Sequence, residues 1–232
     1  MSLSHEKQLK KKRHTVNFLT GLTEEEKLWR RGYTVIGVDE VGMGPLAGPV
    51  IAVAVTIRAK AAREIEDIMA LGIRDSKMLS EKKRERIFEA LTAHPRVAWG
   101  RGSVDEKIVD EINVLQAGLR AMQEAVMQLL AQRASAADER LFLCVDGTRI
   151  VPDIIADQRS IIAGDAKVFS IACASIIAKV LRDRMMNDYA KQYPGYGFER
   201  HKGYGTKMHM ESIGKNGPCP IHRKSFLKSV SL

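Results

Sequence analysis

The stretch from Tyr33 to Ile57, YTVIGVDEVGMGPLAGPVIAVAVTI, constrains the fold more than any other. It opens with an apolar run, 33–38, which stops at two adjacent acids, Asp39 and Glu40. A segment rich in glycine and proline then leads into a second apolar run, 49–57. This pattern predicts a strand, a loop and a second strand.

The two acids at the end of the first run need an explanation. A buried strand that ends in adjacent carboxylates leaves both charges unpaired at the sheet edge, which is costly unless a cation or an arginine lies near them. The residue types also fit a tight polar turn between two hairpin strands, because the pattern Gly42-x-Gly44 is weak by itself. Both interpretations stay open on these residues alone.

Composition narrows the class of protein. A chain of 232 residues with 45% hydrophobic content can bury the core of one domain of average to large size, and we expect this rather than two small domains. Lysines and arginines number 37 against 28 acids, a formal charge of +9, which favours a polyanionic partner such as nucleic acid.

Targeting and redox signals are weak throughout the chain. No apolar run approaches the roughly 20 residues that span a bilayer, and the first residues lack a signal-peptide apolar region, so we expect a cytoplasmic protein with no membrane contact. The three cysteines, Cys144, Cys173 and Cys219, lack the paired spacing of zinc or disulfide frameworks. We expect reduced thiols.

The chain divides into three predicted parts. Residues 1–32 form a basic extension, whose first dozen residues we expect to be disordered and which either adds phosphate contacts or is only a solvated arm. Residues 33–192 alternate strands and helices, which is typical of an α/β layer fold with a mostly buried sheet. Residues 193–232 are basic and rich in glycine and proline, and we expect a small helical subdomain that closes over the active edge of the sheet.

Periodicity predicts the remaining elements. The expected helices are 61–71, one that begins after Ser80, one over 108–134, and a long helix to about Tyr189; the expected strands are 97–104, 141–145 and a short one ending at Gly164. Asp165 stands where it could cap the long helix.

Two further acids stand at predicted strand ends. Asp146 follows the apolar run 141–145, and Asp165 lies between a strand and a helix. Carboxylate oxygens are the ligands that Mg²⁺ prefers, and two such ions about 3.5 to 4 Å apart can promote phosphodiester hydrolysis. A simple turn at Asp146 and a simple helix cap at Asp165 are the alternatives. Asp183, flanked by two arginines in a helix, is expected to form a structural ion pair.

The order of these segments decides between the alternatives. VDEVGMGPLAGPV, an Asp-Gly pair after an apolar strand, GDAK, SIACASIIAKVLRDRM and HKGYGTKMHMESIGKNGPCPIHRKSF follow one another as in ribonuclease HII. Over about residues 33–227 the chain resembles bacterial members of that family. The resemblance implies a ribonuclease H-like layered fold, with a central mixed sheet flanked by helices and a small C-terminal helical subdomain.

The resemblance also implies site residues. The catalytic and metal-binding acids would be Asp39, Glu40, Asp146 and Asp165, with Mg²⁺ or Mn²⁺ as the cofactor. Substrate contacts are predicted at Gly42, Met43, Gly44, Lys77, Lys167, Lys202, Tyr204 and Arg223. Tyr204 would pack on the sugar beside the junction of RNA and DNA, while the backbone of the Gly42–Gly44 loop would contact the 2′-hydroxyl. Met43 stands where the family usually has arginine. Lys77 belongs to an Asp-Ser-Lys segment that matches the family, or else is part of an ordinary helix-entry loop.

The implied activity is that of an endonuclease. It would hydrolyse the phosphodiester 5′ to ribonucleotides in RNA–DNA hybrids and at single ribonucleotides in duplex DNA, leaving 5′-phosphate and 3′-hydroxyl ends. A structure-selective DNA nuclease of the same superfold and a noncatalytic hybrid-binding protein are the alternatives. A monomer is the simplest expectation, and no Gln-led aromatic tail for a sliding clamp is evident.

Overall fold

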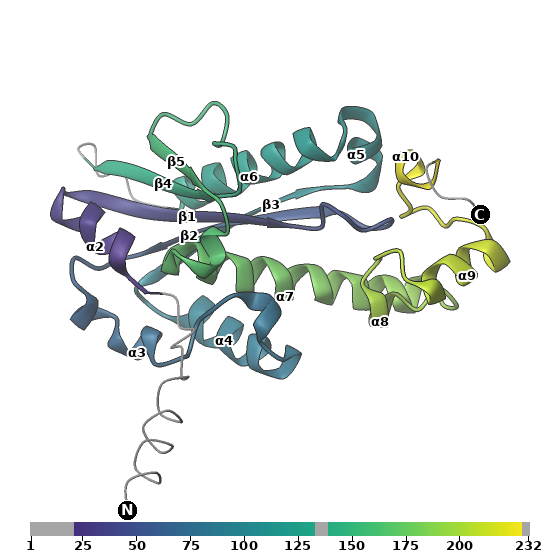
Figure 1. The fold of residues 1–232 in the computed structure, drawn as a ribbon, viewed down its shortest axis with the longest axis horizontal. Coiled ribbons are helices and arrows are strands. Elements are labelled where there is room, and N and C mark those ends of the chain that lie inside the picture. The colour runs from purple at the N-terminus through teal and green to yellow at the C-terminus, as the bar shows by residue number, and fades with distance from the viewer. Residues whose placement is uncertain (1–20, 133–138, 229–232) are drawn as a thin grey trace, which may run out of the picture.

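The fold comes from a computed structural model, which describes residues 21–132 and 139–228 (Figure 1). The predicted disorder of the first dozen residues lies outside these ranges. Within them, no helix is long and apolar enough to cross a membrane.

One mixed sheet of five strands forms the centre of the molecule. Its strands are β1 (Tyr33–Val41), β2 (Val50–Ile57), β3 (Val97–Val104), β4 (Arg140–Asp146) and β5 (Asp157–Ile161). They lie in the order β3-β2-β1-β4-β5. The first three strands pair antiparallel, whereas β4 pairs parallel with β1 and β5 pairs parallel with β4. The predicted mixed sheet of an α/β layer fold is therefore confirmed.

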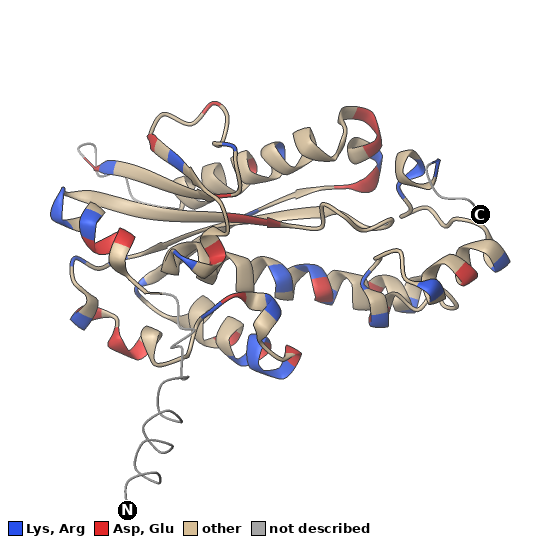
Figure 2. Cartoon of the chain, in the orientation of Figure 1, with Lys and Arg blue, Asp and Glu red and all other residues tan. Residues whose placement is uncertain are grey.

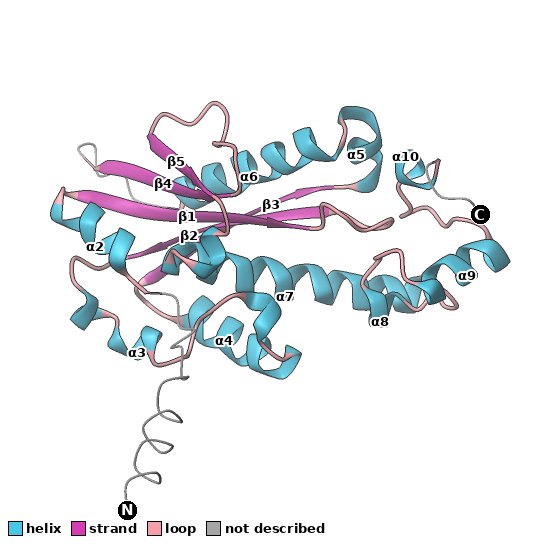
Figure 3. Ribbon diagram, in the orientation of Figure 1, coloured by secondary structure: helices cyan, strands magenta, loops and turns pink. Residues whose placement is uncertain are grey.

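Helices cover both faces of this sheet, as Figure 3 shows. They are α2 (Thr23–Arg30), α3 (Glu66–Met69), α4 (Glu81–Ala93), α5 (Glu106–Ile112), α6 (Val114–Ala131), α7 (Phe169–Gln192), α8 (Phe198–His201), α9 (Lys207–Asn216) and α10 (Lys224–Leu227). Single turns of 3₁₀ helix, η1 (Ala62–Glu64), η2 (Ser76–Met78) and η3 (Gly164–Ala166), interrupt the connections.

Two predicted helices are shorter or broken. The helix expected over 61–71 is only η1 and α3, since Ile65 between them has a non-helical ψ of 24°. The helix expected over 108–134 is split into α5 and α6 at Asn113, whose φ is +67°. The Asn113 side chain accepts hydrogen bonds from the amides of Leu115 and Gln116, so it ends one helix and caps the next.

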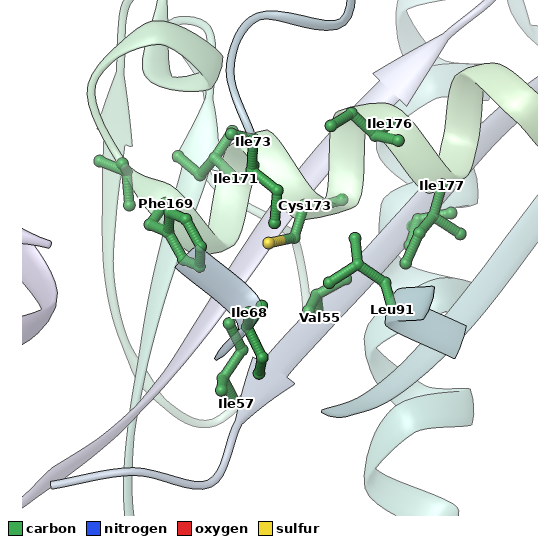
Figure 4. Packing of buried hydrophobic residues seen from close by; sticks show 14 of the residues in the cluster. Val55, Ile57, Ile68, Ile73, Leu91, Phe169, Ile171, Cys173, Ile176 and Ile177 are labelled. Atoms are coloured by element: carbon green, nitrogen blue, oxygen red, sulfur yellow. The ribbon is translucent and has the colours of Figure 1, made fainter. Parts of the chain in front are cut away.

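The two faces of the sheet have separate apolar cores. On one face α6 packs over β2 and β3, with Val126 and Leu129 fully buried. On the other face α7 packs along β1 and β2, with α4 beyond it, and Figure 4 shows this core around Val55, Leu91 and Ile177. Burying these stripes supplies most of the stabilisation of the sheet layers.

The start of α7 lies directly on β1. A Cβ added at Gly37 would stand 2.2 Å from the carbonyl carbon of Ser170, which is a severe overlap. The small residues of the segment SIACASIIA around this contact are buried, as their size predicts. Gly37 thus allows the helix to approach the strand that carries the first two acids.

The C-terminal elements gather beyond the sheet, at the far end of α7 (Figure 1). A third apolar cluster holds them there, in which Phe198, Tyr196 and Ile221 pack with Met186 of α7 and Ala47 of the loop after β1. This arrangement supports a C-terminal subdomain, and its boundary at residue 193 stays a proposal.

Candidate active site

The first three acids lie at the carboxyl ends of two neighbouring parallel strands. Asp39 and Glu40 are close to the end of β1, and Asp146 is the last residue of β4. The register pairs Val38 with Val145, so Asp39 and Asp146 follow at the same level of the sheet. Figure 2 shows the acidic segment of β1 near the middle of the molecule. We call these acids, with Asp165, the acidic edge.

The predicted strand that ends in Asp39 and Glu40 is found, with one further residue. The strand does not stop before Asp39, because β1 continues to Val41 and the backbone still pairs with β2. Glu40 lies opposite Ala52 in that ladder. The acids therefore belong to the paired backbone of the last residues of β1.

Asp165 is also placed differently from the prediction. It lies in η3, and α7 begins only at Phe169, so Asp165 does not cap the long helix. The amide and hydroxyl of Ser170 instead donate to the carboxylate of Glu25, at 2.8 and 2.9 Å. Glu25 comes from α2, far away in the sequence, and no local pattern could have revealed it.

A hydrogen bond joins the turn that carries Asp165 to the end of β4. The amide of Gly164 donates to Oδ1 of Asp146 at 2.6 Å. The ammonium of Lys77, on an exposed side chain, lies 3.8 Å from Oδ2 of Asp165. The predicted acids and one predicted lysine are therefore brought together from four separate elements, β1, η2, β4 and η3.

Burial and mutual repulsion disturb the ionisation of these acids. The pKa of Asp39 is raised well above its ordinary value, first by burial and then by the charges of Glu40 and Asp146. Burial and Asp146 raise the pKa of Glu40 to about 7. Burial, Asp75 and Asp146 raise the pKa of Asp165 in the same direction. The charged forms of Asp39, Glu40 and Asp165 are thus destabilised, and the charge of Asp146 contributes to all three shifts.

A serine partly offsets this effect at Asp39. A hydrogen bond from Ser175 of α7 lowers the pKa of Asp39, although less than burial raises it. The hydroxyl of Ser175 also lies 3.1 Å from that of Ser76, which belongs to the Asp-Ser-Lys segment.

The acidic edge has the ligand chemistry that a hard divalent cation requires. In the described ranges no three His, Cys, Asp or Glu side chains are already arranged so that they could hold a metal ion. The edge nevertheless concentrates carboxylate oxygens, and Oε2 of Glu40 is buried without a hydrogen-bond partner. The residues fit such a cation, provided that side-chain rotations draw the carboxylates together.

Arg223 supports the loop that follows the acids. It is fully buried, and its guanidinium donates to the carbonyl oxygens of Gly42 at 2.6 Å, Met43 at 3.3 Å and Gly48 at 2.7 Å. This placement replaces the predicted phosphate contact, since its donors already face the backbone. In a planar trans peptide the amide points away from the preceding carbonyl, and the described chain has no cis bond. The amides of Met43 and Gly44 therefore point away from Arg223.

Arg182 holds the rest of that loop, and sequence reasoning missed it. Its guanidinium, fully buried, donates to the carbonyls of Ala47, Pro49 and Lys202 at 2.9 to 3.0 Å. We call Arg182, Arg223 and the carbonyls that they bind the arginine clasp. The neighbouring Asp183 pairs with Lys179 at 2.6 Å and lies 3.9 Å from Arg84, which confirms the predicted structural ion pair.

Met43 turns its side chain toward α6. Its sulfur would lie 3.0 Å from a Cβ added at Gly118, and the residue packs at the margin of the α6 core. Met43, Glu40 and Asp146 line one hollow of about 130 Å³. A larger hollow of about 560 Å³ around Trp29 contains none of the acids, so size alone does not identify the site.

The other predicted substrate contacts fall into two groups. Tyr204 is 42% exposed, and its ring lies 3.8 Å from the Cβ position of Gly44, so the aromatic face stands beside the loop. The ammonium of Lys167 donates to the carbonyl of Ile162 at 2.6 Å, and that of Lys202 donates to the carbonyl of Glu199 at 2.8 Å. Lys77 and Tyr204 are thus better placed for a substrate than the other two lysines.

Comparisons with known proteins point to one family. Residues 36–229 match the family model for ribonuclease HII. The ribonuclease HII of Caldicellulosiruptor bescii is 49% identical over 207 residues, which cover 89% of this chain and 93% of that protein. The ribonuclease HII of Endomicrobium trichonymphae is 50% identical over 194 residues, covering 84% and 85%.

Solved structures share the fold. The ribonuclease H2 of Pyrococcus horikoshii OT3 is similar with a TM-score of 0.63 at 27% identity, covering 83% of this chain and 93% of that one. A Bst-RNase HIII solved in complex with Mn²⁺ is similar with a TM-score of 0.60 at 20% identity, covering 80% of this chain and 63% of that one. The latter likeness concerns the fold alone.

Proposed function

The chain belongs to the ribonuclease HII family, and on that premise we propose that it cleaves the phosphodiester bond on the 5′ side of a ribonucleotide, both in RNA–DNA hybrids and at single ribonucleotides within duplex DNA. The broader activity, that of a ribonuclease H hydrolase, follows from family membership. What we propose beyond this activity is the substrate, the bond that is cleaved and the ends of the products.

One observation carries the proposal: the acidic edge and the arginine clasp adjoin each other. The clasp takes up the carbonyls of Gly42 and Met43, so the next two amides face away from it. Neither amide donates to another backbone or side-chain group in the described residues. Two amides without partners beside four acids suit a sugar hydroxyl next to a phosphate that is to be cleaved.

The acids account for the metal requirement of the family. We propose that Asp39, Glu40, Asp146 and Asp165 hold two Mg²⁺ or Mn²⁺ ions, which would make the attacking water more acidic and stabilise the departing oxygen. The raised pKa of Glu40, about 7, and its unpartnered Oε2 support this role, because a cation would relieve the repulsion from Asp146.

Sugar selection would rest on the loop and on Tyr204. The 2′-hydroxyl is the group that distinguishes RNA from DNA, and the amides of Met43 and Gly44 can donate to its oxygen. The exposed ring of Tyr204, close to Gly44, would pack on the adjoining sugar and fix the junction. Lys77 would contact a phosphate, since its ammonium is exposed and lies close to Asp165.

The products follow from the bond that breaks. A water oxygen forms a bond to phosphorus, the bond from phosphorus to the 3′ oxygen of the preceding nucleotide breaks, and a proton goes to that oxygen. The ribonucleotide keeps a 5′-phosphate, and the preceding strand ends in a 3′-hydroxyl.

A duplex with one embedded ribonucleotide tests the proposal. We expect incision on the 5′ side of the ribonucleotide, loss of incision with EDTA, and no incision of an all-DNA duplex of the same sequence. End labelling identifies the termini. Comparable cleavage of the all-DNA duplex would instead indicate a structure-selective DNA nuclease of the same superfold. The predicted monomer stays a prediction for light scattering to test.

A further inference from the structure

Three histidines form a buried cluster that the proposed chemistry does not use. His201 ends α8, His209 lies in α9, and His222 precedes α10. Their exposed fractions are 8%, 0% and 2%. The rings of His201 and His209 are stacked at 4.3 Å, and that of His222 lies 5.2 Å from His209. Buried polar rings need defined partners, so each ring nitrogen has to be accounted for.

The partners determine where the protons are. Burial lowers the pKa of His209 to about 4 and also lowers the pKa of His222, so both rings are neutral at pH 7. The amide of Cys219 lies 2.9 Å from Nδ1 of His222 and can only donate, which leaves the proton of that ring on Nε2. That proton faces Nε2 of His209 at 3.0 Å.

His209 must then carry its proton on Nδ1. This nitrogen lies 2.9 Å from the carbonyl oxygen of Tyr204, which can only accept. The opposite order would set the lone pair of Nδ1 against that carbonyl and a proton on His222 Nδ1 against the amide of Cys219. The carbonyl oxygen and the sulfur of Cys219 also lie 3.1 Å from Nδ1 of His222. They do not alter the position of the His209 proton, because the carbonyl of Tyr204 requires it on Nδ1.

The chain of hydrogen bonds joins the two substrate-contacting parts of the site. At one end it reaches the carbonyl of Tyr204, which also accepts from the amide of Thr206 at 2.8 Å. At the other end the backbone of His222 forms a β-bridge with Ala47, in the loop that the arginine clasp holds. Tyr204 itself has its ring beside Gly44. The histidine chain therefore runs between the segment that carries the tyrosine ring and the loop that carries the amides.

We propose that His209 and His222 are positioning residues, which hold Tyr204 at a set distance from the Gly42–Gly44 loop through the sequence Cys219 N–H to His222, His222 N–H to His209, and His209 N–H to the carbonyl of Tyr204. The proposal rests on the proposed function only for its kinetic consequence. The hydrogen-bond order itself is independent of activity.

Two variants of one residue separate positioning from simple packing. His209→Asn places an amide N–H where Nδ1 stood, so it keeps the bond to Tyr204, whereas His209→Gln places its amide near Nε2 and serves only His222. Both lose part of the ring, so similar losses of Tm are expected. On a duplex with one ribonucleotide, we expect kcat of His209→Asn within about threefold of wild type and that of His209→Gln about tenfold lower, with little change in KM.

A double-mutant cycle with Tyr204→Ala sharpens the test. If His209 acts through Tyr204, His209→Gln adds little further loss in a Tyr204→Ala background. The proposal would be overturned if His209→Asn and His209→Gln lost kcat equally, in proportion to their loss of Tm. Full additivity of His209→Gln with Tyr204→Ala would overturn it too.

A spectroscopic measurement covers the case in which the wild type does not cut the single-ribonucleotide duplex. Long-range ¹H–¹⁵N spectra of histidine-labelled protein at pH 7 distinguish a proton on Nδ1 from one on Nε2. We expect Nδ1–H at His209 and Nε2–H at His222. The reverse pair, or rings protonated on both nitrogens, would refute the hydrogen-bond order, whereas inactive protein with the expected tautomers would count against the proposed substrate alone.

Discussion

The acidic edge and the arginine clasp adjoin each other where β1 leads into the loop 42–49, and they differ in how far hydrogen bonds satisfy their buried charges. At the edge, Asp39 and Glu40 are destabilised by burial and by one another, and Oε2 of Glu40 has no partner. In the clasp, Arg182 and Arg223 are at least as buried, yet their guanidinium groups donate to six backbone carbonyls in all. No carboxylate is needed there.

This difference indicates which region acts and which region supports. A charge that the fold leaves unsatisfied costs stability and persists where a ligand is to bind, whereas a satisfied charge fixes the shape of the backbone. Substitutions in the edge should therefore remove activity without lowering stability. Substitutions in the clasp should lower stability before they affect activity.

The largest expected effect is on activity at the edge. Asp39→Asn or Asp146→Asn removes a carboxylate that the cation requires, so we expect cleavage of a single-ribonucleotide duplex to fall by more than about 1,000-fold, or about 4 kcal/mol. The free energy of unfolding without metal should stay equal or rise, because repulsion is relieved.

Asp183→Asn is the matched control, since Asp183 is also buried but is paired with Lys179. It should lose stability and keep near-normal turnover. Near-normal cleavage by Asp39→Asn would remove the acidic edge from the active site.

Breaking the clasp should give the next largest effect. Arg223→Met leaves the carbonyls of Gly42 and Gly48 buried without their donor, so we expect the free energy of unfolding to fall by about 2 to 4 kcal/mol. Urea titration measures this change. Arg200→Met, at an exposed arginine of the same subdomain, should cost less than about 0.5 kcal/mol. Similar losses in both variants would mean that the carbonyl contacts contribute little.

The pH dependence of stability should differ between the edge and the histidine cluster. Burial and Asp146 raise the pKa of Glu40 from 4.5 to about 7, so between these values the native protein holds a proton that the unfolded chain releases. Stability from this group is present below pH 4.5 and is lost as the pH rises to 7. Burial lowers the pKa of His209 from 6.5 to about 4, so its contribution rises with pH over that window instead.

Glu40→Gln removes the contribution to stability that falls as the pH rises. In denaturant titrations without metal from pH 4.5 to 7.5, wild type should lose stability relative to Glu40→Gln, on the order of 2 kcal/mol. Mg²⁺ should reduce the difference. Parallel profiles for the two proteins would show that Glu40 titrates normally.

The smallest effect is expected at Met43, which lies between the two regions. The clasp binds the carbonyls of the loop and so orients its amides, and the side chain of Met43 packs toward Gly118. We therefore expect an active wild type, and an increase in kcat/KM of less than about tenfold for Met43→Arg on a single-ribonucleotide duplex. An inactive wild type that Met43→Arg rescues would show that the side chain, rather than the backbone, is required.

Local patterns were enough to predict the sheet and the segments that carry the acids. The apolar runs predicted β1, β2, β3 and β4 to within a few residues, because strand formation follows composition and alternation over short windows. The helix predicted to begin after Ser80 does so, because the Ser80 side chain accepts from the amide of Lys83 and caps α4. The order of the motifs indicated the family, which the comparisons then showed.

Tertiary structure alone decided how these segments are held. The continuation of β1 through its acids depends on pairing with β2, and the cap of α7 comes from Glu25, 145 residues before Ser170. Arg223 reaches back 181 residues to the carbonyl of Gly42. Sequence patterns report on neighbours along the chain, whereas the partners of a buried polar group are set by which distant segments the packed cores bring together.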